Sequence, residues 1–521
     1  MKLGSFKLDP RHPGHSTVWV LVFPLIILLA YSDSFREADI YSRIGWYFLL
    51  LSLAYLISNK VIYLLLLLPF FLTGMLDLMY TLTFSQQFEF PVVRVIADTN
   101  QDEASEFLIS YFNLLSFAAL ILYSLVLFYL ARKMELVKPH SRKAKILVVV
   151  GLLMLVMAVR QLVYYERYRD FLPGALGQGV DGVAKYIRVE DEMKKRPELL
   201  ANYTGKVVKP ITKQPKTFVV VVGESAARKH HSIYGYHRDT NPRLSQIQNE
   251  LIVFDQVSSP WAITYLSLAQ ALTQATRENG MEFPSSLSLV GMAKKAGYKT
   301  WWISSQYKFD GTTLSLSAVA DHSVYMTGYD GDLLPLVKQA IEGSGEDKVV
   351  FVHIRGSHSI YSRRYPADFD YFKSADGIKI YTPSPSSEQI DVVNAYDNSI
   401  RYTDYFLREM IEFLRPLNTI SGVVYFSDHG EEVYDYENFR GHELKRTSPV
   451  MLEIPFLVWL NDAYKEGFGD QYRNMLQNRR QTFLNDEFFD FGLCLMGIKS
   501  DLNIRAVTPC DGSGYHVVSE K

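Results

Sequence analysis

The stretch FVVVVGES, which occupies Phe218–Ser225, gives the clearest indication of the fold of this chain. Its first five residues are apolar and of high β-propensity, so they predict a strand that is buried on both faces. The glycine and the polar residues that follow predict the end of that strand. Similar short runs recur along the rest of the chain and alternate with helical patterns, which predicts an α/β domain with a largely parallel sheet.

Five further runs predict the other strands, and helical patterns fall between them. The strands are expected at Leu251–Val257, Thr300–Ile303, Val349–Ile354, Val423–Phe426 and Phe456–Leu460, and helices at Tyr265–Thr276, Ser285–Lys295 and Val392–Leu414. The sequence contains no internal repeat and no low-complexity segment. We therefore expect one α/β domain over residues 216–521.

Long apolar runs crowd residues 1–160, which are expected to form a membrane anchor. A bilayer helix needs about 20 apolar residues, and we predict five spans, near Thr17–Ser32, Ile44–Ser58, Val61–Phe84, Ile109–Ala131 and Ile146–Val159. A cleaved signal peptide would explain the first run alone, and no small-residue cleavage site follows it.

Lysine and arginine near the span ends predict the orientation of the anchor, because such residues are retained in the cytoplasm. They gather in the N-terminal tail and after the fourth span, whereas acidic residues dominate the loop after the third. Everything after the fifth span is therefore expected outside the cytoplasm, in the periplasm of a cell with two membranes. Residues 161–215 predict an amphipathic linker along the membrane surface, with an ordinary linker helix as the alternative.

The composition of the chain limits the partners and the kinds of metal site that we expect. The formal net charge of the 521-residue chain is -2, which gives no field that would gather nucleic acid, so no nucleic-acid partner is expected. The chain has 2 cysteines, which allow at most one disulfide. A metal ion would therefore be held by His, Asp, Glu or a hydroxyl group.

Polar residues follow three of the predicted strands, where ligands bind in open α/β sheets. Glu224 follows the first strand, His358 lies beyond the fourth, and Asp428 and His429 follow the fifth. Each alone is a common cap or turn residue. Together, carboxylate and imidazole donors suit Zn²⁺ with one position left open. His442 lies on a following loop that could fold back over the same site.

Thr264 stands where the helix Tyr265–Thr276 is expected to begin. A helix cap would explain it without any further role. The functional alternative is that its hydroxyl, at a helix N-terminus that favours anions, is deprotonated against zinc and attacks phosphorus.

The residues around these positions resemble a known family. The run Val222–Arg228, continued by Tyr234–Leu244, closely resembles the first motif of the phosphoethanolamine transferases, which belong to the alkaline phosphatase/sulfatase superfamily. Gly356–His358 with Arg364–Pro366, Ala395–Ile400 and Ser427–Glu431 are similar to later motifs in the same order. The resemblance implies a bacterial inner-membrane protein with five transmembrane helices followed by an alkaline phosphatase/sulfatase-like α/β/α domain in the periplasm.

The resemblance also implies an activity. A zinc-dependent transferase would move phosphoethanolamine from phosphatidylethanolamine to an envelope glycan, the lipopolysaccharide core or lipid A, through a covalent threonine intermediate. By the same resemblance one zinc ion, with room for a second, is bound by Glu224, Thr264, Asp428 and His429, and Thr264 is the nucleophile. His358 and His442 are implied beside the transferred phosphate or at the second zinc.

Four further positions match substrate contacts of the family. Ser305 and Lys308 match residues that touch the bound phosphoethanolamine, and Thr99 and Glu103 match residues that hold the amine of the lipid donor. An exposed helix start, with a threonine cap and acids in its first turn, would also explain Thr99 and Glu103.

Two departures bear on the acceptor. The lipid A-modifying members carry several disulfides, and they have an asparagine where this chain has Val95. Both departures leave core sugars or a periplasmic glucan open as acceptors. A phosphoglycerol transferase of the lipoteichoic acid type would share the anchor, the metal and the threonine.

Three other readings are weaker. Ser225 resembles the nucleophile of an α/β-hydrolase with Asp428 and His442 as partners, but the last glycine of that motif is missing and Glu224 and His429 would have no role. Sulfatase chemistry needs an arginine that Ser258–Trp261 lacks. A catalytically silent membrane scaffold would need neither bound zinc nor a reactive threonine.

Overall fold

The computed structural model describes residues 175–306, 311–342, 345–443, 447–502 and 508–511, the helices α3 (Lys60–Phe84) and α6 (Leu114–Lys133), and short pieces elsewhere before residue 175. The chain divides into two compact units, Met1–Val189 and Glu190–Lys521. The division falls within α8 (Ala175–Met193). Residues 190–215, expected to form part of the linker, thus group with the second unit, and the domain boundaries stay a prediction.

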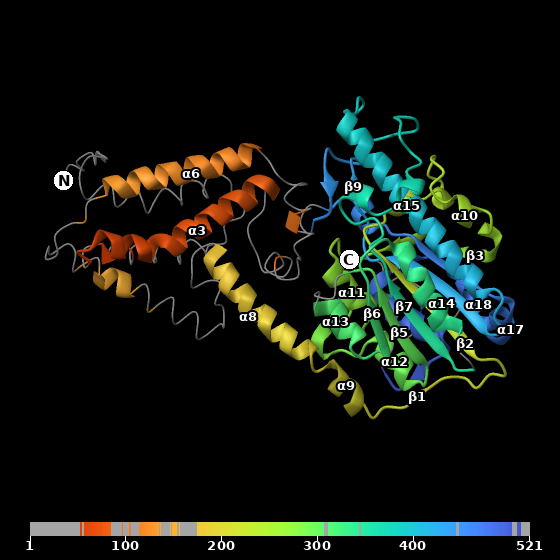
Figure 1. The fold of residues 1–521 in the computed structure, drawn as a ribbon. Helices are drawn as coiled ribbons and strands as arrows, with labels where there is room; N and C mark the ends of the chain where they lie inside the picture. Colours follow the sequence, from red (N-terminus) through yellow and green to blue (C-terminus); the bar gives the residue numbers. More distant parts are fainter. Residues whose placement is uncertain are drawn as a thin grey trace. The chain divides into compact units, whose positions relative to one another are not determined.

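Among the described residues, a seven-stranded sheet with the order β3-β11-β8-β2-β7-β5-β6 forms the centre of the second unit. Figure 1 labels β2, β3, β5, β6 and β7 of this sheet. Its strands are β2 (Lys216–Gly223), β3 (Leu251–Val253), β5 (Lys299–Ser304), β6 (His322–Tyr325), β7 (Lys348–His353), β8 (Ile420–Ser427) and β11 (Phe456–Leu460). β11 runs antiparallel to β8 and β3, and the other neighbouring pairs are parallel. The prediction of a largely parallel sheet is confirmed.

Alternate residues of β2 enter two hydrophobic cores, one on each face of the sheet. Phe218 and Val220 belong to the first core, and Val219 and Val221 belong to the second. The first is covered by α11 (Thr264–Ala271), α12 (Leu289–Lys295), α13 (Gly311–Ser317), α17 (Asp462–Gly467), α18 (Gly469–Asn478) and α19 (Phe488–Leu495), and the second by α10 (Pro242–Ser245), α14 (Leu334–Glu342) and α15 (Ser387–Leu414). Side chains alternate between the faces of a strand, so a strand covered on both faces is apolar throughout.

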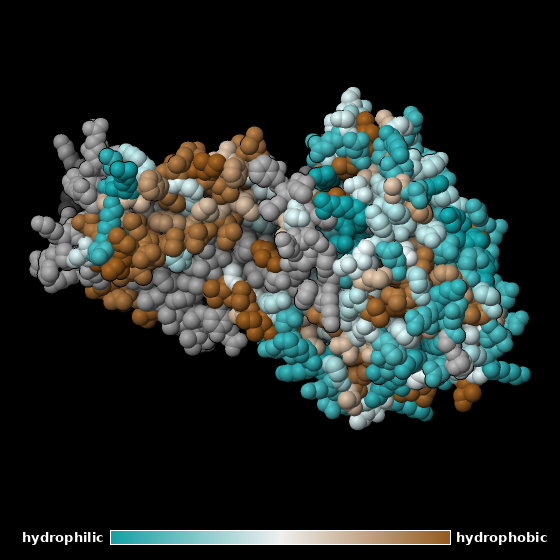
Figure 2. Space-filling model, viewed as in Figure 1, coloured by the Kyte–Doolittle hydropathy of each residue, from teal (hydrophilic) through white to brown (hydrophobic). Residues whose placement is uncertain are grey.

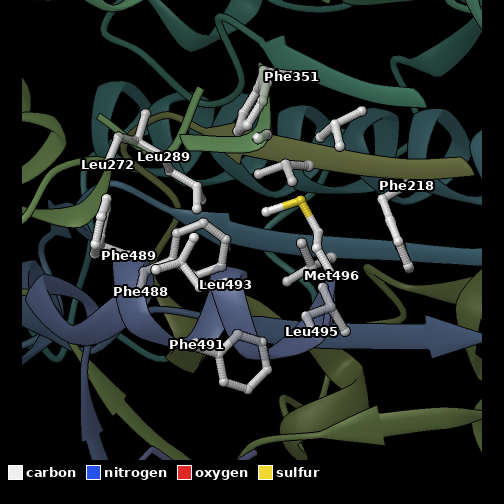
Figure 3. Close-up of a cluster of buried hydrophobic side chains, with 14 of the residues drawn as sticks. Phe218, Leu272, Leu289, Phe351, Phe488, Phe489, Phe491, Leu493, Leu495 and Met496 are labelled. Atoms are coloured by element: carbon white, nitrogen blue, oxygen red, sulfur yellow. The ribbon is translucent and has the colours of Figure 1, made fainter. Parts of the chain in front are cut away.

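The first core is the larger of the two. Phe488, Phe491 and Leu493 of α19 gather there with Leu289 of α12 (Figure 3). Burial of one such side chain contributes about 1.5 to 3 kcal/mol. The disulfide between Cys494 and Cys510 ties the end of the described chain to the same helix, α19.

Smaller elements surround the sheet. They are α9 (Arg196–Asn202), α16 (Pro449–Leu452), the paired strands β1 (Val207–Val208) and β13 (Lys499–Ser500), β4 (Gln256–Ser258) and β12 (Thr482–Leu484), and β9 (Glu432–Val433) and β10 (Arg440–Gly441), and the 3₁₀ turns η2 (Arg228–His230), η3 (Ser232–Tyr234), η4 (Gln248–Glu250), η5 (Phe283–Ser285), η6 (Asp330–Leu333), η7 (Tyr361–Arg363), η8 (Ala367–Phe369) and η9 (Asn485–Glu487).

The expected strand Leu251–Val257 is two strands, because the chain changes partner in the middle. The backbone N–H of Phe254 still donates to β11, at Phe456, but that of Asp255 donates to the carbonyl of Arg479. After this turn β4 pairs with β12 instead of joining the main sheet. Helix α11 is shorter than predicted and ends at Ala271.

The first unit contains two helices relevant to the predicted anchor. α6 is long and apolar enough to cross a membrane. α3 is long and apolar enough only if its two halves, Lys60–Pro69 and Gly74–Thr83, are counted as one span with a bend of 45° between them. The bend begins at Pro69, which cannot donate a helix hydrogen bond.

The outer surface of both helices is apolar. Leu65, Leu115 and Phe128 are exposed, whereas Leu78 and Tyr123 belong to a buried cluster between the helices. Brown, hydrophobic residues dominate the visible surface of this unit (Figure 2). An apolar outer surface suits a lipid environment. The span expected near Thr17–Ser32 lies outside the described residues, the one near Ile44–Ser58 lies mostly outside them, and the one near Ile146–Val159 lies partly outside them. The number of five spans stays a prediction.

Candidate metal centre

Three neighbouring strands, β8, β2 and β7, end at the same edge of the sheet, and each continues into a polar turn. The turns are joined by backbone hydrogen bonds. The N–H of Asp428 donates to Gly223 over 3.1 Å, and the N–H of Ser357 donates to Glu224 over 2.9 Å. The order of the strands therefore brings Glu224 beside Asp428 and His429, as the sequence predicted.

Thr264 joins this group from the start of α11. Its Oγ1 lies 3.3 Å from Glu224 Oε1 and 3.3 Å from His429 Nε2. The N-cap of α11 is Ile263, and no side chain caps the helix. Thr264 is therefore the first residue of the helix and not its cap, and its hydroxyl faces the carboxylate and the imidazole.

The spacing of the four side chains fits a metal ion. His429 Nε2 lies 3.5 Å from Glu224 Oε1 and 3.4 Å from Asp428 Oδ2, similar to the distances around Thr264. Good hydrogen bonds are shorter than this. Ligands of a tetrahedral zinc ion, with bonds of about 2.0 to 2.1 Å, are separated by roughly 3.3 Å. These four separations are those expected between ligands of one zinc ion, and the ligand atoms of Glu224, Asp428 and His429 all lie within 4.8 Å of one another.

Burial and charge support the same interpretation. Asp428 Oδ2 is buried and has no hydrogen-bond partner within the part of the chain that the structure describes. Burial, and then the charge of Asp428, raise the pKa of Glu224 well above its ordinary value. Two carboxylates buried side by side are unfavourable unless a cation compensates their charge. The site therefore fits a zinc ion held by Glu224, Thr264, Asp428 and His429.

Neighbouring backbone groups orient two of these side chains. His429 Nδ1 donates to the carbonyl of Gly430 over 2.8 Å, so Nε2 carries the lone pair that faces the site. Burial lowers the pKa of His429, which favours the neutral form that binds metals. Asp428 Oδ1 accepts the backbone N–H groups of Ser225 (3.1 Å) and His429 (2.7 Å), which leaves Oδ2 for the site.

A second group of possible ligands adjoins the first. His429, Glu431 and His442 each place a ligand atom within 4.8 Å of the others. The rings of His429 and His442 have their centroids 4.2 Å apart. Burial acts to lower the pKa of His442, but Glu431 outweighs it and raises that pKa. The sequence assigned no role to Glu431, although it stands in the quoted motif Ser427–Glu431.

His358 lies near enough to His442 and His429 for their charges to act on its imidazole. Burial, and then the nearby positive charges of Arg364 and His442, lower the pKa of His358 well below its usual range. The guanidinium group of Arg364 donates to the carbonyls of His358 (3.1 Å) and Ser359 (2.8 Å), which holds the turn that carries this histidine.

The predicted substrate contacts have a mixed outcome. Ser305 is buried, and its hydroxyl donates to Asp330 over 2.6 Å and accepts the N–H of Arg355 over 2.9 Å. It therefore links two turns, and its contact with phosphoethanolamine stays a prediction. Lys308, Thr99 and Glu103 lie outside the described residues.

The sequence reasoning missed Gln306, which contacts the metal centre. Its amide nitrogen donates to Glu224 Oε2 over 3.4 Å and to the carbonyl of Ile354 over 3.2 Å. Gln306 follows the end of β5, and this position at a strand end was the signal that could have identified it.

The hydrolase alternative finds no support in this geometry. The hydroxyl of Ser225 donates to Glu224 over 2.9 Å, and Ser225 is fully buried with a φ of 55°. His442 is bonded through Nδ1 to Glu431, over 2.6 Å, and not to Asp428. The nucleophile and the base of that alternative triad, Ser225 and His442, are therefore bonded to other residues.

Comparisons with known proteins agree with the geometry. The Sulfatase family profile matches residues 216–498. Phosphoethanolamine transferase EptC of Escherichia coli K12 is 30% identical over 423 residues, which cover 74% of this chain and 72% of EptC.

Two solved structures extend the comparison. The zinc complex of the C-terminal periplasmic domain of E. coli EptC is 29% identical, with a TM-score of 0.53 over 58% of this chain and 87% of that domain. The integral membrane protein lipooligosaccharide phosphoethanolamine transferase A of Neisseria meningitidis has a TM-score of 0.64 and covers 96% of both chains. Its identity of 18% supports a common fold only.

Proposed function

Because the chain belongs to the sulfatase family and, within it, to the phosphoethanolamine transferases, we propose that it transfers phosphoethanolamine from phosphatidylethanolamine to an envelope glycan through Thr264. The position of Thr264 is the main observation that supports the proposal. Its hydroxyl lies 3.3 Å from a buried carboxylate oxygen and 3.3 Å from a buried imidazole nitrogen, at the first residue of a helix.

We assign the zinc ion to Glu224, Thr264, Asp428 and His429. When bound, zinc would make the threonine hydroxyl a better nucleophile and compensate the negative charge of the phosphate. The protein positions these groups before the substrate arrives, because the turns after β2 and β8 are fixed by backbone hydrogen bonds. The N-terminus of α11 adds backbone N–H groups that favour an anion.

The proposed reaction has two steps. In the first, Thr264 Oγ1 forms a bond to phosphorus, the bond from phosphorus to the glyceride oxygen breaks, and diacylglycerol leaves with a proton. In the second, an acceptor hydroxyl oxygen forms a bond to the same phosphorus and gives up its proton, the bond from phosphorus to Thr264 Oγ1 breaks, and Thr264 is regenerated with a proton. His358 and His442, beside the centre, would compensate charge on the phosphate or transfer these protons.

Variants of Thr264 test this reaction. Thr264→Ala should keep most of its zinc but lose both diacylglycerol release and transfer, whereas Thr264→Ser should retain part of each. Thr273→Ala is the matched control, because Thr273 follows the same helix and its hydroxyl donates only within that region, to Ala269. Release of diacylglycerol by Thr264→Ala at the wild-type rate would refute the covalent route.

The donor and the acceptor need separate experiments. A phosphoglycerol transferase would consume phosphatidylglycerol in preference to phosphatidylethanolamine, so the two lipids should be compared in purified assays. For the acceptor, mass spectrometry of lipid A, core oligosaccharide and periplasmic glucans, with and without the protein, distinguishes the candidates. We expect the added phosphoethanolamine on one of these glycans.

We also propose a multi-pass inner-membrane protein with its catalytic domain in the periplasm. The distribution of lysine and arginine in residues 1–160 supports this topology. Val180, Val183 and Ile187 are exposed along one side of α8, which supports the amphipathic linker expected for residues 161–215. A reporter enzyme that works only outside the cytoplasm should therefore be active when it is fused after the C-terminus.

A further inference from the structure

A chain of hydrogen bonds runs from Tyr361 through the buried carboxylate of Glu431 to His442. The hydroxyl of Tyr361 donates to Glu431 Oε1 over 2.8 Å, and His442 Nδ1 donates to Glu431 Oε2 over 2.6 Å. The side chain of Glu431 is 0% exposed, while that of His442 is 24% exposed. Both oxygens of the carboxylate are therefore occupied, and the histidine is partly exposed to solvent.

These bonds restrict the imidazole to one orientation and, in its neutral form, to one tautomer. A carboxylate that accepts the Nδ1–H fixes the neutral tautomer in which Nε2 has the lone pair, and it prevents the ring from turning over. A reversed ring would place a C–H group against Glu431 and leave a buried oxygen without a donor. His442 can therefore use Nε2 for the substrate.

The folding of the hairpin β9–β10 creates this pairing. Glu432 of β9 lies opposite Gly441 of β10, so Glu431 and His442, the flanking residues, are brought face to face. Residues eleven positions apart in sequence thus form one unit through the hairpin.

The turn that carries Tyr361 is held under backbone strain. Ile360, directly before it, has a φ of 47°, a conformation that β-branched residues rarely adopt. The guanidinium group of Arg364 holds the turn by donating to the two preceding carbonyls, at His358 and Ser359. The ring of Tyr361 packs edge-on against Tyr396, with centroids 5.0 Å apart. Strain retained at one turn is typical of segments that position functional groups.

A second metal ion is the alternative use for Glu431. At the first centre, however, the candidate ligand atoms are 3.3 to 3.5 Å apart. The 2.6 Å between Glu431 Oε2 and His442 Nδ1 is a charge-assisted hydrogen bond, too short for two ligands of a shared ion. The geometry favours orientation of His442 over metal binding by this pair.

We propose that Glu431 and Tyr361 are positioning residues, which hold His442 in one tautomer and one orientation with Nε2 presented to the transferred phosphate. This inference rests on the proposed function. It predicts that the two residues affect turnover only through His442.

The experiment uses the full-length protein in phosphatidylethanolamine vesicles and measures diacylglycerol release, KM, zinc content and thermal midpoint. Glu431→Ala should lower kcat by about 10- to 100-fold, the usual range for residues that orient a ligand or a catalytic group, with KM and zinc content unchanged. Glu431→Gln, which keeps an acceptor for Nδ1–H, should recover part of this loss. Tyr361→Phe should show a smaller loss of the same kind.

Tyr365→Phe is the matched control. Tyr365 is also buried near this turn, but its hydroxyl is bonded to Asp370 and not to Glu431. Its removal should leave kcat within about twofold of wild type while shifting the thermal midpoint like Tyr361→Phe.

A double-mutant cycle gives the decisive comparison. In a His442→Ala background, Glu431→Ala should cause no further loss of kcat. Multiplicative losses, or loss of zinc in Glu431→Ala, would overturn the positioning role. A wild-type protein that releases no diacylglycerol would overturn the proposed function together with this inference, so the two failures are distinguishable.

Discussion

Replacement of Gly356 by alanine should disturb the metal centre without touching any of its side chains. Gly356 has a φ of 49°, and a Cβ atom there would lie 2.8 Å from the carbonyl oxygen and 3.0 Å from the nitrogen of Glu224. Ordinary contact begins at 3.4 Å, so the shorter distance must grow by about 0.6 Å. Both atoms belong to the backbone of a candidate zinc ligand, and neither can rotate away.

The loss of folding stability expected for Gly356→Ala has two contributions. Alanine in the left-handed conformation costs roughly 1 to 2 kcal/mol, and the steric overlap adds about 1 to 3 kcal/mol. Gly235→Ala isolates the first part, because Gly235 has a φ of 94° and nothing within 4 Å of the added atom. The difference between the two variants is therefore the cost of moving Glu224 or its turn.

Thermal unfolding, elemental analysis and diacylglycerol release measure these effects. Gly235→Ala should lose stability but keep its zinc and its turnover. Gly356→Ala should lose more stability, and its turnover should fall by about 10- to 100-fold, because displacements approaching 1 Å at a catalytic group have effects of this size. Equal turnover in the two variants would show that the turn at Gly356 does not place Glu224.

Three further predictions concern the metal, the pH dependence and the disulfide. Asp428→Ala should lose most of the bound zinc in elemental analysis, and full zinc content would contradict the assigned centre. Burial acts to lower the pKa of His230, but two buried aspartates outweigh the effect of burial and raise this pKa from 6.5 to about 10. The stability that protonated His230 contributes is therefore complete below pH 6.5 and is lost as pH rises through 10. The thermal midpoint should therefore fall between pH 7 and 10 in wild type and less so in His230→Asn, and parallel curves would contradict this. Cys510→Ala should lose about 3 kcal/mol of stability, since the disulfide joins residues 16 positions apart; an unchanged midpoint under oxidising conditions would show that it contributes little.

Much of the sheet could be predicted from the sequence because its inner strands are buried on both faces. The apolar runs at β2, β8 and β11 follow directly from that burial. β6 escaped prediction because only four residues, His322–Tyr325, form it, and the first two are polar and exposed at the edge of the sheet. The break between β3 and β4 depends on a partner from residues 479–484, which local sequence does not reveal.

The candidate metal centre was predictable for a similar reason. Parallel strands bring their ends together, so residues at strand ends can be grouped before the structure is known. The environment of His442 was not predictable in this way, because Glu431 reaches it only through the β9–β10 hairpin and Tyr361 comes from a separate turn. Tertiary contacts of this kind leave no periodic signal in the sequence.

Peptide mass spectrometry of the purified protein, after brief incubation with phosphatidylethanolamine and no acceptor, shows whether Thr264 forms the covalent intermediate. We predict that the peptide containing Thr264 gains the mass of one phosphoethanolamine group, at Thr264 itself, and that this modification disappears when an acceptor glycan is added. Release of diacylglycerol without modification of Thr264, or modification at Ser225 instead, would contradict it.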